Sequence, residues 1–309
     1  MARGVYVIYF DWNYSHIDYW YYFCFTSDEE KKMKKVLRLF IFFIIFIAGF
    51  LMLVYPSMQQ ILGQHEMDQQ INEFRSSNKD YPTLYYQMQG YNQRIFNENQ
   101  TGLKDAWSYQ ENEFDFSELN TDKDMIGYIS IDAMSISLPL YVGATEANMN
   151  KGAVVLGQTS MPIGGNNTNC VIAAHRGTYT SAMFRDIENL QLGDTIQVTN
   201  PWETLEYEVV KCIAISPDDI DAIKIIPGSD MVTLMSCHPY PNNYQRYVVY
   251  AQRKGTQAIE IPYTGENYES SQDKLKWDRL IQLAGVAFFI VVVLIILVSI
   301  VIRRIRNVK

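Results

Sequence analysis

Two uncharged apolar runs, one near each end of the 309-residue chain, limit most strongly how it can fold. The first run covers residues 39–55 and the second covers residues 280–302. Each is close to the roughly 20 apolar residues that a helix needs to cross a bilayer. One such run could be a buried core helix, but two runs, both flanked by basic clusters, favour two membrane-spanning helices.

Basic residues beside these runs predict the orientation of the chain in the cell membrane. Four lysines and an arginine lie within residues 31–38, and three arginines and a lysine lie within residues 303–309. Because cytoplasmic flanks are enriched in such residues, we expect both termini in the cytoplasm and residues 56–279 outside the cell. Trp277, at the outer edge of the second run, is typical of an interfacial anchor.

The start of the chain has its own interpretation. Residues 1–32 are rich in aromatic residues but lack the length and periodicity of a membrane span. Met33, followed by two lysines and an apolar run, is typical of a natural start, so we expect residues 1–32 to be a non-native upstream extension. The first apolar run is too long for a removable signal peptide and lacks a small-residue cleavage site.

Charge and cysteine content narrow the possible partners and sites. The net charge is −8, and the central segment is more acidic still because the ends hold many of the bases, which argues against nucleic acid as a partner. Cys24 lies on the cytoplasmic side, and Cys170 and Cys212 lie in apolar runs typical of buried strands. Cys237 remains as an unpaired external thiol, for which catalysis is the best explanation.

The central segment changes character near residue 126, where short runs rich in β-forming residues begin. Turn residues separate the runs, and this spacing is typical of a closed barrel or a sandwich. Before them, residues 57–100 carry apolar residues at helical spacing and predict one or two helices, although a plain stalk fits equally well. Ser181 is a possible cap for one predicted helix over residues 181–190. The predicted strands are 126–131, 136–142, 171–175, 195–199, 204–216, 231–237 and 247–253.

Cys237 ends the apolar run Thr-Leu-Met-Ser-Cys, beside a Pro-rich loop, where a strand would present a thiol at a rim. The thiolate is the reactive form of cysteine, so a nearby base or cation aids it. His175 is the preferred base, because strand alternation turns His238 away from the side of Cys237. Arg246 could stabilise developing oxyanion charge, although a buried Cys, a structural His and a surface Arg are the usual fates of such residues.

Metal binding is the alternative use of these side chains. A zinc site made from Cys237, His238 and His175 lacks a fourth ligand at a suitable spacing, so we expect neither a metal nor a cofactor.

These residues resemble the sortase family of cysteine transpeptidases from Gram-positive cell surfaces. The run Thr233-Leu-Met-Ser-Cys237 is similar to the family's T-L-x-T-C strand, with Ser236 where Thr is usual. Ala174-His175-Arg176-Gly177 resembles its histidine segment, and Arg246 falls at its arginine. The resemblance covers roughly residues 124–254 and continues through the segments 138–141, 159–165 and 181–186.

The resemblance implies a mainly β fold: a closed eight-stranded barrel with short helices, preceded by a helical N-terminal region and flanked by two transmembrane helices. The chain then divides into a cytoplasmic N-terminus (1–38), a transmembrane helix (39–55), a helical extracellular region (56–100), a lid or linker loop (101–123), the catalytic barrel (124–256), a linker (257–279), a second transmembrane helix (280–302) and a basic cytoplasmic tail (303–309).

The resemblance also implies a reaction. Cys237 would cleave the Thr–Gly bond of an L-P-x-T-G-like sorting signal and form a thioacyl intermediate, with His175 protonating the leaving amine and Arg246 holding the carbonyl oxygen. An incoming amine would resolve the thioester. In the class C, pilin-polymerising group that amine is a pilin lysine, whereas in anchoring sortases it belongs to a cell-wall precursor. A non-enzymatic surface adaptor is a third, weaker hypothesis.

The triplet Asp105-Ala106-Trp107 stands where class C sortases carry an Asp-Pro-aromatic lid over the active site. Ala106 replaces the proline, and a chance match in a surface loop is the alternative. With a lid, Asp105 would lie near Arg246 and Trp107 would cover Cys237. The triplet, the second span and the extended N-terminal region all favour the pilin-polymerising group.

Overall fold

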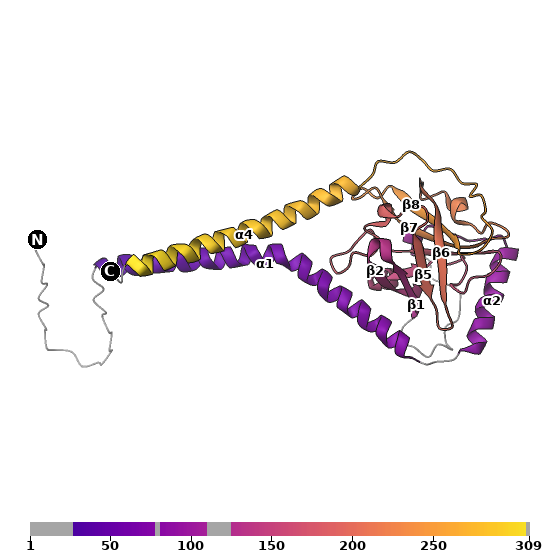
Figure 1. The fold of residues 1–309 in the computed structure, drawn as a ribbon, viewed down its shortest axis with the longest axis horizontal. Helices are drawn as coiled ribbons and strands as arrows, with labels where there is room; N and C mark the ends of the chain where they lie inside the picture. The colour runs from indigo at the N-terminus through magenta and orange to yellow at the C-terminus, as the bar shows by residue number, and fades with distance from the viewer. Residues whose placement is uncertain (1–26, 78–80, 110–124, 307–309) are drawn as a thin grey trace, which may run out of the picture. The chain divides into compact units, whose positions relative to one another are not determined.

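The computed structural model describes residues 27–77, 81–109 and 125–306 (Figure 1). The chain divides into two units, residues 1–49 and residues 50–309. In its described part, the first unit consists of the N-terminal half of helix α1 (Ser27–Ser76). The second unit holds the rest of α1, a β-barrel and the remaining helices.

A closed barrel of eight strands forms the centre of the second unit, as the sequence predicts. The strands follow each other around the barrel in the order β1-β2-β3-β4-β7-β8-β6-β5. The pairs β2–β3 and β4–β7 are parallel and the other pairs are antiparallel. Their bounds are β1 (Met125–Ile131), β2 (Ile136–Val142), β3 (Ala153–Val155), β4 (Thr168–Ala173), β5 (Thr195–Thr199), β6 (Thr204–Ile215), β7 (Asp230–His238) and β8 (Gln245–Arg253).

The barrel interior is filled by apolar side chains from alternate strand positions. Ile172, Leu234 and Val249 are fully buried, and each pairs in register with the next across β4, β7 and β8. Burial of a side chain of this size contributes roughly 1.5–3 kcal/mol. This packing fixes the register of the strands that carry Cys237 and Arg246.

Helix α2 (Pro82–Asn97) packs on the barrel through one apolar stripe. Leu84, Met88, Tyr91 and Ile95 recur at helical spacing and are buried in the same core as the strands. Asn92 adds a polar anchor, because its side chain accepts a hydrogen bond from the Met161 amide and donates one to the Met161 carbonyl. The predicted helical region therefore forms part of the folded domain.

Helix α1 runs without interruption through Pro56, where the sequence predicts a boundary between the span and the extracellular region. An interior proline costs a helix about 3 kcal/mol. Further along the same helix, Met67 and Ile71 are buried against the barrel cores. Two such side chains contribute a stabilisation of similar size to the proline's cost.

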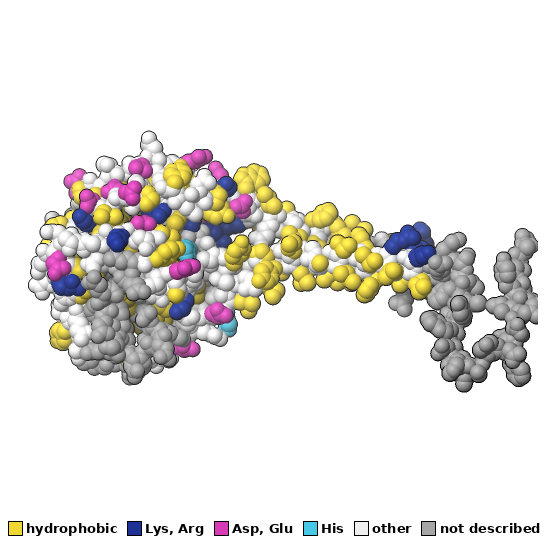
Figure 2. All heavy atoms as spheres, turned by 180° about the vertical axis from the view of Figure 1, so that it is seen from behind, with side chains coloured by type: hydrophobic (Ala, Val, Ile, Leu, Met, Phe, Trp, Pro, Cys, Tyr) yellow, Lys and Arg dark blue, Asp and Glu magenta, His cyan; other side chains and the backbone are white. Residues whose placement is uncertain are grey.

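Helices α1 and α4 (Gln272–Arg306) are each long and apolar enough to cross a membrane. The apolar windows of both helices are 0% buried within the protein, and Figure 2 shows their exposed apolar side chains. Exposed apolar surfaces of this kind are unfavourable in water and mark contact with a membrane or with another protein. Helix α4 begins at Gln272, so part of the predicted linker over residues 257–279 is helical.

One predicted element is wrong, and two short elements were not predicted from the sequence. Residues 181–190 form turns and a short 3-10 helix, η4 (Ile187–Asn189), in place of a longer helix. The buried residues Phe184, Ile187 and Leu190 recur every three positions, which is the 3-10 period. The sequence analysis also misses the three-residue strand β3 and the short helix α3 (Glu146–Lys151).

Candidate active site

The pairing of strands β4, β7 and β8 brings together the three residues predicted to carry the chemistry. Cys237 on β7 and Arg246 on β8 are direct cross-strand partners. On the other side, Ala173 of β4 pairs in parallel with Met235, and the Ala174 amide donates to the Met235 carbonyl at 3.2 Å. His175 follows the end of β4 by two residues, and it lines the same pocket as Cys237.

A pocket of about 410 Å³ opens over these residues. Cys237 is 8% exposed and lies at its base. His238, in contrast, is fully buried and packs against the rings of Tyr247 and Tyr268. The two neighbours therefore occupy different environments, in keeping with strand alternation. The pocket is lined by Trp107, His175, Arg176, Gly177, Cys237, Tyr240, Asn243 and Arg246.

Asp105 lies on Arg246 in a two-pronged ion pair. Oδ1 accepts from Nε at 2.7 Å and Oδ2 accepts from Nη2 at 2.9 Å. The carboxylate also accepts a hydrogen bond from the Trp107 amide and so begins the 3-10 turn η1 (Ala106–Ser108). The pair is mostly buried, and a charge-assisted hydrogen bond of this kind contributes about 1.5–3 kcal/mol.

Trp107 lies over the same residues. The guanidinium carbon of Arg246 is 4.6 Å from the Trp107 ring centroid, and the ring centroid of His175 is 6.3 Å away. The ring lines the pocket that contains Cys237. Ala106, where the resemblance leads one to expect proline, is fully buried between the acid and the aromatic residue. The η1 turn thus occupies Arg246 and narrows access to the thiol.

Burial shifts the pKa values of the thiol and the imidazole toward their neutral forms. Burial raises the pKa of Cys237 to about 11; Arg246 and Arg176 oppose the rise, whereas Asp105 adds to it. Burial also lowers the pKa of His175, with only a partial counter-effect from Glu146. Removing Asp105 from Arg246 would leave an uncompensated cation beside the thiol, which favours the thiolate.

Glu188 ties together the residues that follow the two candidate catalytic residues in the chain. Its side chain is 3% exposed, pairs with Arg176 and lies 3.1 Å from Nδ1 of His238. It also accepts hydrogen bonds from the Ser270 hydroxyl and the Ser271 amide, at 2.8 and 3.0 Å. One carboxylate therefore fixes the chain just after His175 and just after Cys237. The sequence analysis missed this residue.

Burial alone would raise the pKa of Glu188, but the His238 ring, the Arg176 charge and the Ser270 hydroxyl outweigh it and lower the pKa to about 2. Among the described residues, no group of three or more His, Cys, Asp or Glu side chains could hold a metal ion. The side chains that line the pocket include a thiol, an imidazole and a guanidinium, those of Cys237, His175 and Arg246.

We predict that Glu188 stabilises the protein above about pH 4.5 and that this contribution disappears as the pH falls toward 2, since its folded pKa lies below the ordinary 4.5. Glu188→Gln should lower the free energy of unfolding near neutral pH by about 3–5 kcal/mol, because it leaves the buried Arg176 without its counter-charge. The melting temperature of the full chain in detergent, measured from pH 2 to 7, should then vary less steeply in the variant. Glu206→Gln, in an exposed pair with Lys254, is the control and should change little. Equal effects of the two variants would contradict the role given to Glu188.

We also predict that the two residues of the η1 turn control the thiol in different ways. Asp105→Asn should lower the pKa of Cys237, because it removes the charge that raises this pKa and releases Arg246. Trp107→Ala should raise the labelling rate at every pH by opening the pocket. The rate of iodoacetamide labelling of Cys237 is measured as a function of pH. Asp105→Asn should shift the midpoint of this curve to lower pH, whereas Trp107→Ala should raise the rate reached at its plateau. Wild-type labelling curves for both variants would show that the turn does not control the thiol.

Comparison with known proteins matches this chain and its fold to one family. The sortase domain profile matches residues 129–254. Sortase A from Bacillus anthracis is 32% identical over 136 residues, which are 44% of this chain and 63% of that protein. Sortase D from Bacillus subtilis is 25% identical over 130 residues, 41% of this chain and 63% of its own length. The chain thus spans less than two thirds of the length of these curated relatives.

Solved structures of class C sortases match more completely. Sortase C-1 from Streptococcus pneumoniae is 31% identical, with 63% of this chain and 100% of that chain covered and a TM-score of 0.54. Sortase C1 of pilus island 1 from group B Streptococcus is 29% identical, with coverages of 62% and 98% and a TM-score of 0.54. Sortase C from Clostridium perfringens is 31% identical, with coverages of 62% and 99% and a TM-score of 0.50. The chain belongs to the sortase family, and its structural neighbours are class C pilin sortases.

Proposed function

We propose that this protein is a membrane-bound class C sortase that links pilin subunits. The observation that carries the proposal is the ion pair between Asp105 and Arg246, with Trp107 in the pocket of Cys237. A turn that occupies the candidate oxyanion residue and narrows access to the thiol has the properties of a lid. The class C structural neighbours support the same assignment.

In the proposed reaction, opening of the lid frees Arg246 and admits the sorting signal. Cys237 passes its proton to His175, and the thiolate attacks the threonine carbonyl carbon while Arg246 donates hydrogen bonds to the oxyanion. Collapse of the tetrahedral intermediate breaks the Thr–Gly bond, and His175 protonates the leaving glycine amine. A thioester between Cys237 and the threonine remains.

An amine from the acceptor completes the transfer. It attacks the thioester, gives its proton to His175 and displaces the Cys237 thiolate, so an amide bond replaces the thioester. No oxidation and no cofactor is needed. A pilin lysine as acceptor gives a polymer, whereas the amine of a cell-wall precursor gives an anchored surface protein. Anchoring to peptidoglycan is the second candidate, because the same three side chains serve either acceptor.

We predict that transfer depends on Cys237, His175 and Arg246. The full chain in detergent is incubated with an L-P-x-T-G-like peptide and a lysine-containing pilin peptide, and the linked product is measured by mass spectrometry. Cys237→Ala should form no product. His175→Ala and Arg246→Ala should each lower the rate by at least about 100-fold.

Cys212→Ala is the matched control, since this half-buried thiol lies on β6 outside the pocket. It should retain wild-type turnover. Turnover by Cys237→Ala would contradict the mechanism. Replacing the lysine peptide by a cell-wall stem peptide decides between the two acceptors, and exclusive use of the stem peptide would favour anchoring.

The membrane arrangement is part of the proposal. The apolar surfaces of α1 and α4 support two spans, and the basic clusters at both ends support cytoplasmic termini. We predict that protease added outside intact cells removes the barrel and spares tags at both ends of the chain. Digestion of a C-terminal tag by the external protease would show that the C-terminus lies outside the cell and would contradict the proposed orientation of α4.

A further inference from the structure

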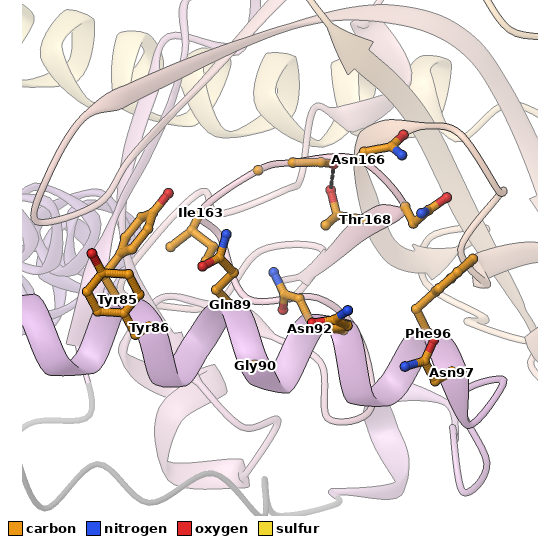
Figure 3. A pocket seen from close by; sticks show the side chains of 14 residues that line it. Tyr85, Tyr86, Gln89, Gly90, Asn92, Phe96, Asn97, Ile163, Asn166 and Thr168 are labelled. Atoms are coloured by element: carbon orange, nitrogen blue, oxygen red, sulfur yellow. Dashed lines mark hydrogen bonds between the residues drawn. The ribbon is translucent and has the colours of Figure 1, made fainter.

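A second hollow, of about 690 Å³, lies between helix α2 and the loop of residues 163–168 (Figure 3). It shares no lining residue with the pocket of Cys237. None of the described residues that line it carries a charge. In Figure 3, Gln89, Asn92 and Phe96 rise from α2 toward the loop that carries Asn166. We call this hollow the α2 groove.

Contacts with the rest of the domain fix both walls of the α2 groove. Helix α2 is fixed by its buried stripe and by the two hydrogen bonds between Asn92 and Met161. On the loop, the Gly165 amide donates to Oδ2 of Asp230 at 3.0 Å, and Oδ1 of Asn167 accepts from the Gly228 amide at 2.7 Å. The groove is therefore formed before any ligand arrives, which lowers the entropic cost of binding.

The groove face carries side-chain amides that have no hydrogen-bond partner among the described residues. The side chains of Gln89, Gln93 and Asn97 on α2, and of Asn166 on the loop, line the groove and make no such bond. A primary amide offers both donors and an acceptor, and a hydroxyl group offers one donor and two lone pairs. A ligand rich in hydroxyl groups can therefore satisfy each amide in either direction.

Gly90 lies within α2, at the groove. Glycine is among the least favourable residues in a helix interior, second only to proline. A Cβ atom added to Gly90 would meet no described atom within 4 Å, so packing within the described chain does not explain its presence. The missing side chain lets a ligand approach the helix backbone closely.

Aromatic rings complete the lining. Tyr86 is 70% exposed, and Tyr85 is held edge-on by Trp202 with ring centroids 5.1 Å apart. Phe96 is half-buried at the far end of the groove. Flat apolar ring faces beside uncharged hydrogen-bonding groups suit a ligand whose surface alternates C–H faces with hydroxyl groups.

These features point to one class of ligand. None of the described lining residues carries a charge that could recognise a phosphate or an ionic peptide. The one strand residue among them, Thr168 of β4, is already paired with Asp230 of β7, so the described walls offer it no free place to pair with an extended peptide backbone. We infer that the α2 groove binds a neutral carbohydrate chain. This inference is independent of the acceptor used in the transfer reaction.

Calorimetric titration of the full chain in detergent micelles tests the inference. The probes are chitotetraose and maltotetraose as neutral oligosaccharides, and an uncharged peptide of similar size. We expect one of the sugars to bind with saturation and the peptide not to bind. Failure of both sugars to bind at millimolar concentration would overturn the proposal, and preferential binding of the peptide would replace it with a peptide site.

Variants of α2 locate the binding. Gly90→Leu should fill the groove and weaken sugar binding at least tenfold, while the melting temperature stays unchanged or rises because leucine favours a helix. The double variant Gln89→Ala/Gln93→Ala should give a similar loss without added bulk. Gln87→Ala, on the same helix but outside the groove lining, is the matched control. Unchanged affinity in both test variants would contradict the site.

Transfer of the sorting-signal peptide should proceed at the wild-type rate in all three variants. Sugar binding by the wild-type chain without any peptide transfer would argue against the proposed reaction and leave the groove proposal intact. The two proposals therefore fail separately.

Discussion

The arrangement of the active site depends on the position of β7 between β4 and β8. Strand β7 pairs in parallel with β4 and antiparallel with β8. These pairings place the ends of β4 and β7 and the start of β8 at one rim of the barrel. A shift of one residue in either register would turn Cys237 from the pocket into the interior. The buried side chains of Ile172, Leu234 and Val249 oppose such a shift. The packing of the core therefore also determines the geometry of the site.

In the proposed function, the contact between Asp105 and Arg246 makes the closed site less reactive and better protected. With Asp105 on Arg246, the two charges cancel beside a thiol whose pKa is raised to about 11. An unpaired thiol in an oxidising environment is protected when it is protonated and covered. In the proposed reaction the substrate also has to displace this contact, and a mostly buried ion pair worth about 1.5–3 kcal/mol is weak enough for that.

Much of the fold could be predicted from the sequence, because strand alternation and turn residues leave a local signal. The bounds of β2 and β5 agree with the predicted strands, and the Cys237 strand differs by one residue at each end. Strand β3 is too short to show a period, and the spacing of Phe184, Ile187 and Leu190 fits both helix types over so few residues. Glu188 carries no local signal, since Arg176 and Ser270 lie 12 and 82 residues away in the chain. Its role exists only in the folded protein.

The segment between the barrel and α4, residues 254–271, is bound to the barrel at several points. It pairs with Ala214 through Glu266 and accepts the Lys211 ammonium on two of its carbonyls. Just before α4, the Ser271 hydroxyl accepts from the Tyr240 amide, in the loop that follows Cys237. These contacts fasten the segment to the barrel and bring the start of α4 to the loop that follows Cys237. If α4 spans a bilayer, a short hydrogen-bonded stretch of chain joins the membrane helix to the rim that carries the thiol.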